Sequence, residues 1–119
     1  MKNNEITERF SKLSTPLIAD ACVRLEVSFN VAPFGICPVL LDGFVGGRAL
    51  PVRHFGSVDV FLETMNKAEE GDILVVDNND RRDEGCIGDL IVIEAMACNL
   101  GGIVIWGTHR DTPELQHLG

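Results

Sequence analysis

Hydrophobic residues recur at helical spacing near the start of the chain. They lie three or four positions apart, which predicts a first helix: Ile6, Phe10, Leu13. Ser14-Thr15-Pro16 then offers a capping hydroxyl followed by proline, which predicts a second helix over residues 16–25. Residues 27–41 contain two prolines and a glycine. We therefore expect an irregular connection there.

The distribution of apolar residues over residues 43–71 predicts a strand followed by a third helix. Residues 43–55 mix apolar and polar side chains around Gly46-Gly47, which predicts a strand with a bend. A third helix is predicted to begin at Ser57 and to end at Glu69-Glu70-Gly71. Its apolar stripe consists of Val58, Phe61, Leu62, Met65 and Ala68.

Residues 72–107 predict a strand, a helix and a second strand. The run ILVVD after Asp72 is β-branched and apolar, as is typical of a central strand covered on both faces. A polar loop follows over residues 78–84, then an apolar helix over residues 88–99, then the strand GIVIWG. This is a βαβ unit, expected to be right-handed. We predict an α/β fold and a single domain over residues 1–119.

Composition narrows the classes of partner. The formal net charge is −8, and the basic doublet Arg81-Arg82 lies among acidic residues, which argues against a direct nucleic-acid partner. The polar N-terminus lacks a signal-peptide core and no apolar run could span a bilayer, so we expect a cytoplasmic protein with no membrane contact. The four cysteines lack metal-site spacing and are expected to be reduced thiols.

The start of the helix at residue 88 is a candidate anion site. The amides of Gly88, Asp89, Leu90 and Ile91 would lack partners within the helix, and the helix dipole favours a substrate carboxylate there. Taken on its own, Asp89 is explained more simply as a residue that only caps or charges the helix start. Both interpretations remain open from the residues alone.

Arg110-Asp111 follows the second strand, at the end where open α/β sheets bind ligands. The carboxylate can bind a hard divalent cation, and the guanidinium can hold a carboxylate or an enolate oxygen. The alternative is a helix cap before Pro113 and a surface arginine. The three histidines show no metal-ligand spacing and are left out of the site. There is no GxSxG, GxGxxG or GxxxxGK[ST] motif.

Several segments together resemble one known family. These segments are LSTPLIADA, GRALPV, EEGDILVVDN, IGDL and GGIVIWGTHRD. The chain thereby resembles the RraA-like family, which includes the regulator of ribonuclease E activity A and the class II 4-hydroxy-4-methyl-2-oxoglutarate aldolases. The resemblance implies a layered β/β/α, swivelling-domain-like fold in a homotrimer or hexamer. Because such relatives continue beyond the position of Gly119, we expect a C-terminally truncated chain or one completed by association.

The resemblance also implies roles for the candidate residues. Asp111 would hold Mg²⁺ or Mn²⁺, Arg110 would steady the enolate, and Asp89 would order a water on the metal or transfer a proton. Leu90 and Ile91 would bind the pyruvyl carboxylate through their amides. The expected function is a divalent-metal-dependent aldolase that cleaves a 4-hydroxy-2-oxo acid to pyruvate, with oxaloacetate decarboxylation as a side activity. The alternative is a non-catalytic regulator that binds a ribonuclease.

Overall fold

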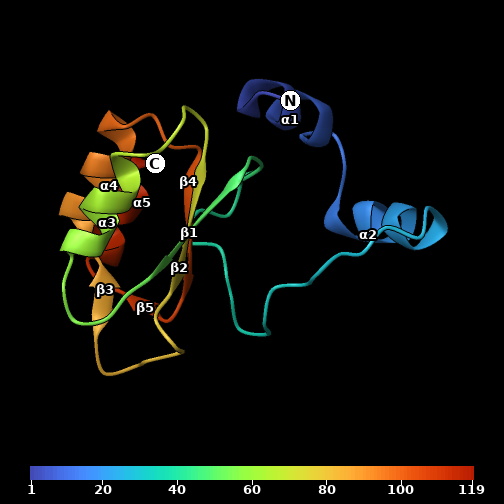
Figure 1. The fold of residues 1–119 in the computed structure, drawn as a ribbon. Coiled ribbons are helices and arrows are strands. Elements are labelled where there is room, and N and C mark those ends of the chain that lie inside the picture. Colours follow the sequence, from blue (N-terminus) through green and yellow to red (C-terminus); the bar gives the residue numbers. More distant parts are fainter.

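The computed structural model describes residues 1–119 and contains ten elements of secondary structure. The elements in chain order are α1 (Asn3–Phe10), α2 (Thr15–Arg24), β1 (Ala49–Arg53), α3 (Asp59–Met65), β2 (Ile73–Asp77), β3 (Gly85–Ile87), α4 (Asp89–Ala97), β4 (Gly102–Trp106), β5 (Thr108–His109) and α5 (Thr112–Leu118). Three helices, α3, α4 and α5, lie together on one side of a three-stranded sheet, while α1 lies on the other side and α2 extends farther away (Figure 1).

The larger sheet has the order β1-β2-β4, and both pairings are parallel. β2 lies between the other two strands, which confirms the predicted central strand. The alternation of side chains along β2 turns Leu74 and Val76 into the main core cluster, which also contains Phe61 and Met65 of α3 and Ala95 of α4. Two residues of the apolar stripe predicted for the third helix, Phe61 and Met65, are therefore in the core, whereas Val58 and Leu62 are exposed.

The βαβ unit predicted for residues 72–107 is confirmed as β2, α4 and β4. Gly88 is the residue that caps α4, and the helix begins at Asp89. β2 and β4 are neighbours in register, with Ile73 opposite Gly102 and Asp77 opposite Trp106. The α/β fold class predicted from the sequence is therefore correct.

Two predicted boundaries were too wide. The strand predicted for residues 43–55 is paired only over β1, because those five residues are the ones that meet a partner on β2. The helix predicted from Ser57 begins at Asp59 instead. The hydroxyl of Ser57 accepts a hydrogen bond from the Asp59 amide at 3.2 Å, which forms a turn ahead of the helix.

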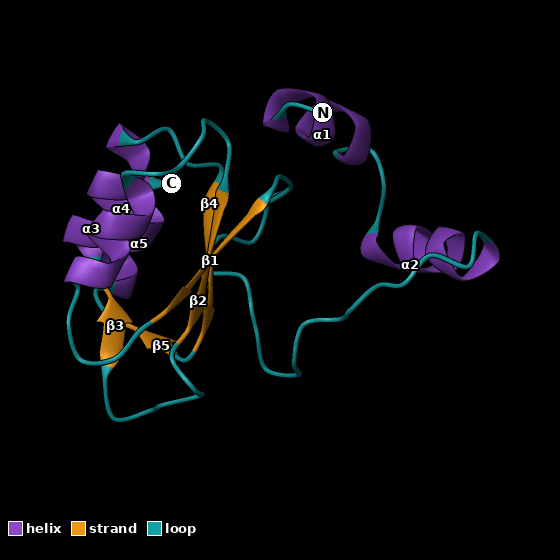
Figure 2. Ribbon diagram, in the orientation of Figure 1, coloured by secondary structure: helices purple, strands orange, loops and turns teal.

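A second sheet was not predicted. β3 and β5 pair in parallel to form a two-stranded sheet beneath the helices (Figure 2). Both strands are too short to produce a readable alternation of polar and apolar positions, so the sequence indicated only a loop before residue 88 and another after residue 107. This small sheet is nevertheless the element that builds the candidate site.

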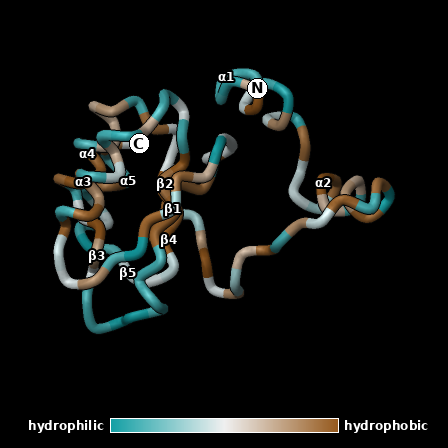
Figure 3. Tube along the Cα trace, in the orientation of Figure 1, coloured by the Kyte–Doolittle hydropathy of each residue, from teal (hydrophilic) through white to brown (hydrophobic).

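The N-terminal part exposes much apolar surface. α2 and the irregular connection to β1 carry hydrophobic positions along most of their length (Figure 3). Exposed large side chains in this region include Leu17, Val23, Leu25, Val31, Phe34 and Leu41. None of the helices combines the length and the apolar character that crossing a bilayer requires.

Candidate functional site

The small sheet brings the two predicted clusters together. β3 ends at Ile87, directly before the helix cap Gly88, and β5 ends at His109, directly before Arg110-Asp111. Ile87 and His109 are paired in register, and the Arg110 amide donates to the Ile87 carbonyl at 2.9 Å. The start of α4 and the Arg110-Asp111 pair therefore lie side by side.

The side chain of Asp111 reaches across to the start of α4. Its Oδ2 accepts a hydrogen bond from the Asp89 amide at 3.4 Å and lies 3.5 Å from Nε of Arg110. Asp111 occupies the cap position of α5, but its side chain makes no capping hydrogen bond there. Asp111 is therefore the cap residue of α5 by position, as the alternative interpretation expected, but not through a side-chain hydrogen bond, and the Arg110 side chain is 70% exposed.

Gly88 makes this close approach feasible. A Cβ atom at this position would lie 2.6 Å from Oδ2 of Asp111 and 2.9 Å from Nε of Arg110. The backbone of Gly88 is extended, with φ −132°, so conformational freedom is not the reason for glycine. The reason is space for two polar side chains against the helix start.

A cavity of about 230 Å³ opens beside these residues. This volume is below the roughly 300–1,000 Å³ of sites for drug-sized ligands and suits a small acid. Four of the six predicted site residues line it: Gly88, Leu90, Ile91 and Arg110. Asp89 and Asp111 lie next to Gly88 but do not line the cavity. The carboxylate of Asp89 is turned back to accept a hydrogen bond from the Leu90 amide at 2.7 Å.

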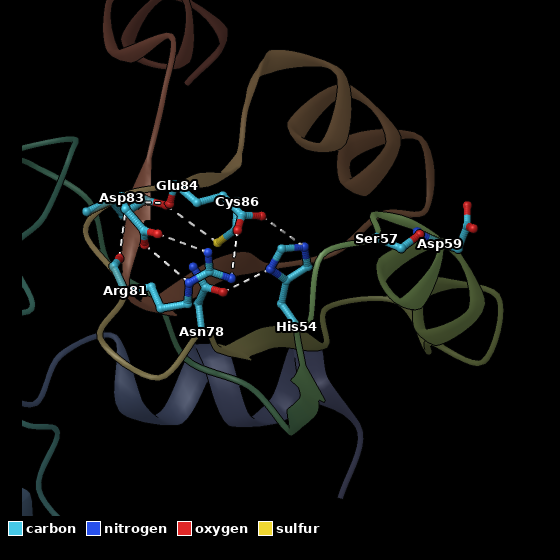
Figure 4. Close-up of polar contacts among 9 residues, drawn as sticks. His54, Ser57, Asp59, Asn78, Arg81, Asp83, Glu84 and Cys86 are labelled. Atoms are coloured by element: carbon cyan, nitrogen blue, oxygen red, sulfur yellow. Dashed lines mark hydrogen bonds and ion pairs between the residues drawn. The ribbon is translucent and has the colours of Figure 1, made fainter.

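The cavity contains two polar residues that the sequence did not indicate, His54 and Glu84. His54 directly follows β1, and its amide donates to the carbonyl of Asp77 at 2.9 Å. One ring nitrogen faces Asn78 and the other faces Glu84 (Figure 4). The position of His54 directly after β1, at the end where parallel sheets place ligands, was the one available signal, whereas Glu84 stands directly before β3. Spacing gave none.

Cys86 also lines the cavity and is a protonated thiol. Burial raises the pKa of the Cys86 thiol above its usual value. The Sγ atom donates to the carbonyl of Thr108 at 3.5 Å, and the residue is buried. Because the thiolate is the reactive form of cysteine, this residue has a packing role.

One carboxylate at the helix start, that of Asp111, is a ligand of the kind that a hard divalent cation binds. The Asp111 side chain is 36% exposed, so its carboxylate is open to solvent beside the Asp89 backbone. Mg²⁺ and Mn²⁺ prefer oxygen ligands, and Mg²⁺ commonly uses one or two carboxylates and retains several waters. No three His, Cys, Asp or Glu side chains cluster as a complete ligand cage. A cation bound at this carboxylate would therefore keep most of its water ligands.

Comparison with solved structures supports the fold. The chain is similar to an uncharacterized protein from Pseudomonas syringae pv. tomato, with a TM-score of 0.78 and 24% sequence identity. The match covers 96% of this chain and 52% of that chain, so the present sequence spans about half the length of this relative. No curated protein sequence is matched.

A family profile provides the remaining comparison. The profile of the RraA-like family, described as Aldolase/RraA, matches residues 15–119. The match includes both strands of the βαβ unit, the small sheet and every predicted site residue. The chain therefore belongs to the RraA-like family.

Proposed function

We propose that this chain carries the site of a divalent-metal-dependent lyase that cleaves a 4-hydroxy-2-oxo acid, of the 4-hydroxy-4-methyl-2-oxoglutarate type, to pyruvate. Membership of a family with aldolase members supports an enzyme. The observation that carries the proposal is the convergence of the α4 start and Arg110 on one cavity, with Asp111 against the same helix start.

Each part of the site has a role in this reaction. The Ile91 amide, in the first turn of α4, binds the carboxylate next to the 2-oxo group, and the Leu90 amide joins it when the Asp89 carboxylate, to which it donates in this structure, turns away. The Arg110 guanidinium lies at the same cavity and stabilises negative charge as it develops on the 2-oxo oxygen. Asp111, with Asp89 beside it, would hold Mg²⁺ or Mn²⁺. When bound, such a cation supplies Lewis acidity toward the 2-oxo oxygen.

The lining of the cavity does not suit Schiff-base chemistry. That route needs a lysine amine at the reacting carbon, and its nucleophilicity depends on a desolvated setting. No lysine lines the cavity. Decarboxylation of oxaloacetate fits the same residues, because it also leaves the pyruvate enolate.

The test is pyruvate release from the 119-residue chain. With Mg²⁺ and 4-hydroxy-4-methyl-2-oxoglutarate, we expect pyruvate to form, measured by coupling to a pyruvate-reducing dehydrogenase, and chelation to abolish it. Arg110→Ala should lower kcat/KM about 100-fold or more, since it removes a charge-stabilising donor. Arg82→Ala is the matched control, because Arg82 pairs only with Asp80 on the exposed loop at 3.3 Å.

The alternative function is a non-catalytic regulator that binds a basic segment of a ribonuclease. One observation favours an acidic docking surface: Arg81 and Arg82 are both neutralised by ion pairs within their own loop. Failure of the unmodified chain to release more pyruvate than Arg110→Ala would reject the lyase. Ribonuclease binding that persists in Asp111→Asn would then support the regulator.

A further inference from the structure

His54 is a buried imidazole in a fixed orientation at the cavity. Its side chain is 2% exposed, and its ring stacks on Phe61 at a centroid distance of 5.0 Å and an angle of 13°. Nδ1 lies 2.9 Å from Oδ1 of Asn78. Stacking on one face and a hydrogen bond at one nitrogen hold the ring in place, so the direction of Nε2 is also fixed.

The partner of Nδ1 decides where the hydrogen lies. With the Asn78 amide oriented as in this structure, its oxygen only accepts hydrogen bonds, and this contact assigns the hydrogen to Nδ1 of His54. In the neutral ring, Nε2 then holds a free lone pair. Asn78 is fully buried, and its Nδ2 has no hydrogen-bond partner.

Nε2 faces a carboxylate that is itself held in place. Oε1 of Glu84 lies 3.7 Å from Nε2, too far for a hydrogen bond but close enough to stabilise a positive ring. The other oxygen of Glu84 pairs with Nη1 of Arg81 at 2.8 Å, and Arg81 also binds Asp83 at 3.1 Å. A proton that arrives at Nε2 would therefore be balanced by a preorganised negative charge (Figure 4).

The other titratable groups at or beside the cavity already take part in hydrogen bonds or ion pairs within the protein. Glu84 is bound by Arg81, and the Cys86 thiol donates to a backbone carbonyl. The carboxylate of Asp89 accepts from the Leu90 amide and does not line the cavity. Nε2 of His54 can accept a proton, and no group in the protein donates a hydrogen bond to it. His54 and Arg110 line the same cavity.

We propose that His54 is the catalytic base that takes the proton from the C4 hydroxyl of the substrate, with Asn78 and Glu84 as positioning residues. This inference rests on the proposed lyase function. Nε2 accepts the hydroxyl proton, the C4 oxygen becomes a carbonyl, and the C3–C4 bond breaks. The electron pair moves to C3 and onto the C2 oxygen, as the enolate. C3 then takes a proton from solvent at the Asp89 side, and His54 returns its proton to solvent.

Oxaloacetate provides a substrate that does not need this base. Its decarboxylation reaches the same pyruvate enolate by loss of CO₂, and no hydroxyl proton is removed. Arg110 is needed for both reactions because both develop charge on the C2 oxygen. Substitution of His54 should therefore impair cleavage but not decarboxylation, whereas substitution of Arg110 should impair both reactions.

The experiment compares both substrates in the 119-residue chain with Mg²⁺. His54→Gln should lower kcat for cleavage of 4-hydroxy-4-methyl-2-oxoglutarate about 100-fold or more, the usual contribution of a general base. Its oxaloacetate decarboxylation should stay within about twofold, which also shows that the variant folds. Glu84→Gln should lower kcat for cleavage about tenfold and leave oxaloacetate decarboxylation unchanged, because it removes the negative charge that faces the His54 ring. Glu63→Gln, which makes the same change at an exposed position of α3 away from the cavity, is the matched control and should retain both activities.

The outcomes separate this inference from the proposed function. Equal losses of both reactions in His54→Gln would assign His54 a structural role and overturn the inference. Full cleavage by His54→Gln would also overturn it. If the unmodified chain processes neither substrate, the lyase proposal fails and this inference fails with it.

Discussion

At the scale of single residues, the site depends on a glycine, Gly88. Gly88 leaves room for Asp111 and Arg110 against the start of α4, and both would contact a Cβ atom placed there. The groups that crowd this position are the ends of partly exposed side chains. They can move aside, so a substitution should disturb function more than folding.

Gly88→Ala tests this role. We expect kcat/KM for pyruvate formation to fall about tenfold or more, because displaced polar groups lose their alignment with the substrate. Thermal unfolding should show a loss of only about 1 kcal/mol. Gly43→Ala is the matched control, since its Cβ would meet the nearest atom at an ordinary 3.5 Å. Unchanged activity in Gly88→Ala would argue against close packing at the helix start.

At the scale of elements, α1 is attached to the sheet by polar contacts. Asn3, its one buried residue, donates to Oδ1 of Asp72 at 2.8 Å and accepts from the Arg48 amide at 2.7 Å. Asp72 is fully buried ahead of β2 and pairs with the Arg48 guanidinium at 2.7 Å. Hydrogen bonds from Arg48, the Glu69 amide and Asn3 hold the pKa of the Asp72 carboxyl far below its usual range.

Asp72→Asn should therefore weaken the fold in a pH-dependent way. The depressed pKa stabilises the folded state above the unfolded value of about 3.9, and this stabilisation is lost as pH falls toward the lower folded-state pKa. At pH 7 we expect a loss of about 2 kcal/mol in the free energy of unfolding. Denaturant unfolding at pH values from 7 down to 3 should show that the difference in the free energy of unfolding between Asp72→Asn and the unmodified chain becomes smaller. Asp42→Asn, at an exposed turn, should show no such gap; a pH-independent gap for Asp72→Asn would contradict the assignment.

At the scale of the whole molecule, apolar surface is unevenly distributed. The core lies between the larger sheet and the helices α3 and α4, whereas α2 and the connection to β1 expose large side chains such as Phe34 and Leu41. Contiguous exposed apolar surface is typical of interfaces. It supports the expectation that copies of this chain associate as a trimer or hexamer.

Light scattering tests this expectation. The unmodified chain should have a mass several times that of one copy, and Phe34→Asp with Leu41→Asp should lower it toward one copy, because buried charges oppose association. Glu63→Lys, on the exposed face of α3, is the control for a change of charge and should leave the mass unchanged. A monomeric unmodified chain would contradict the expectation.

The sequence alone determined the elements whose signal is local. Apolar runs predicted α4 and the central strand β2. Ser14 with Pro16 predicted the start of α2, where the Ser14 hydroxyl accepts a hydrogen bond from the Leu17 amide. These features depend on residues within a few positions of each other. The Arg110-Asp111 pair and the helix start at Gly88 were predicted for the same reason, as local motifs after a strand and before a helix.

Only the tertiary structure decided how these motifs meet. The contact between Asp89 and Asp111 spans 22 positions, and that between His54 and Asn78 spans 24. Both follow from the pairing of strands, and β3 and β5 are too short to leave a pattern in the sequence. The contact of the Asp111 side chain likewise could not be predicted locally, because it accepts from the Asp89 amide and makes no capping hydrogen bond in α5. Local patterns specify elements, whereas the geometry of a site arises from long-range pairing, which a linear pattern does not encode.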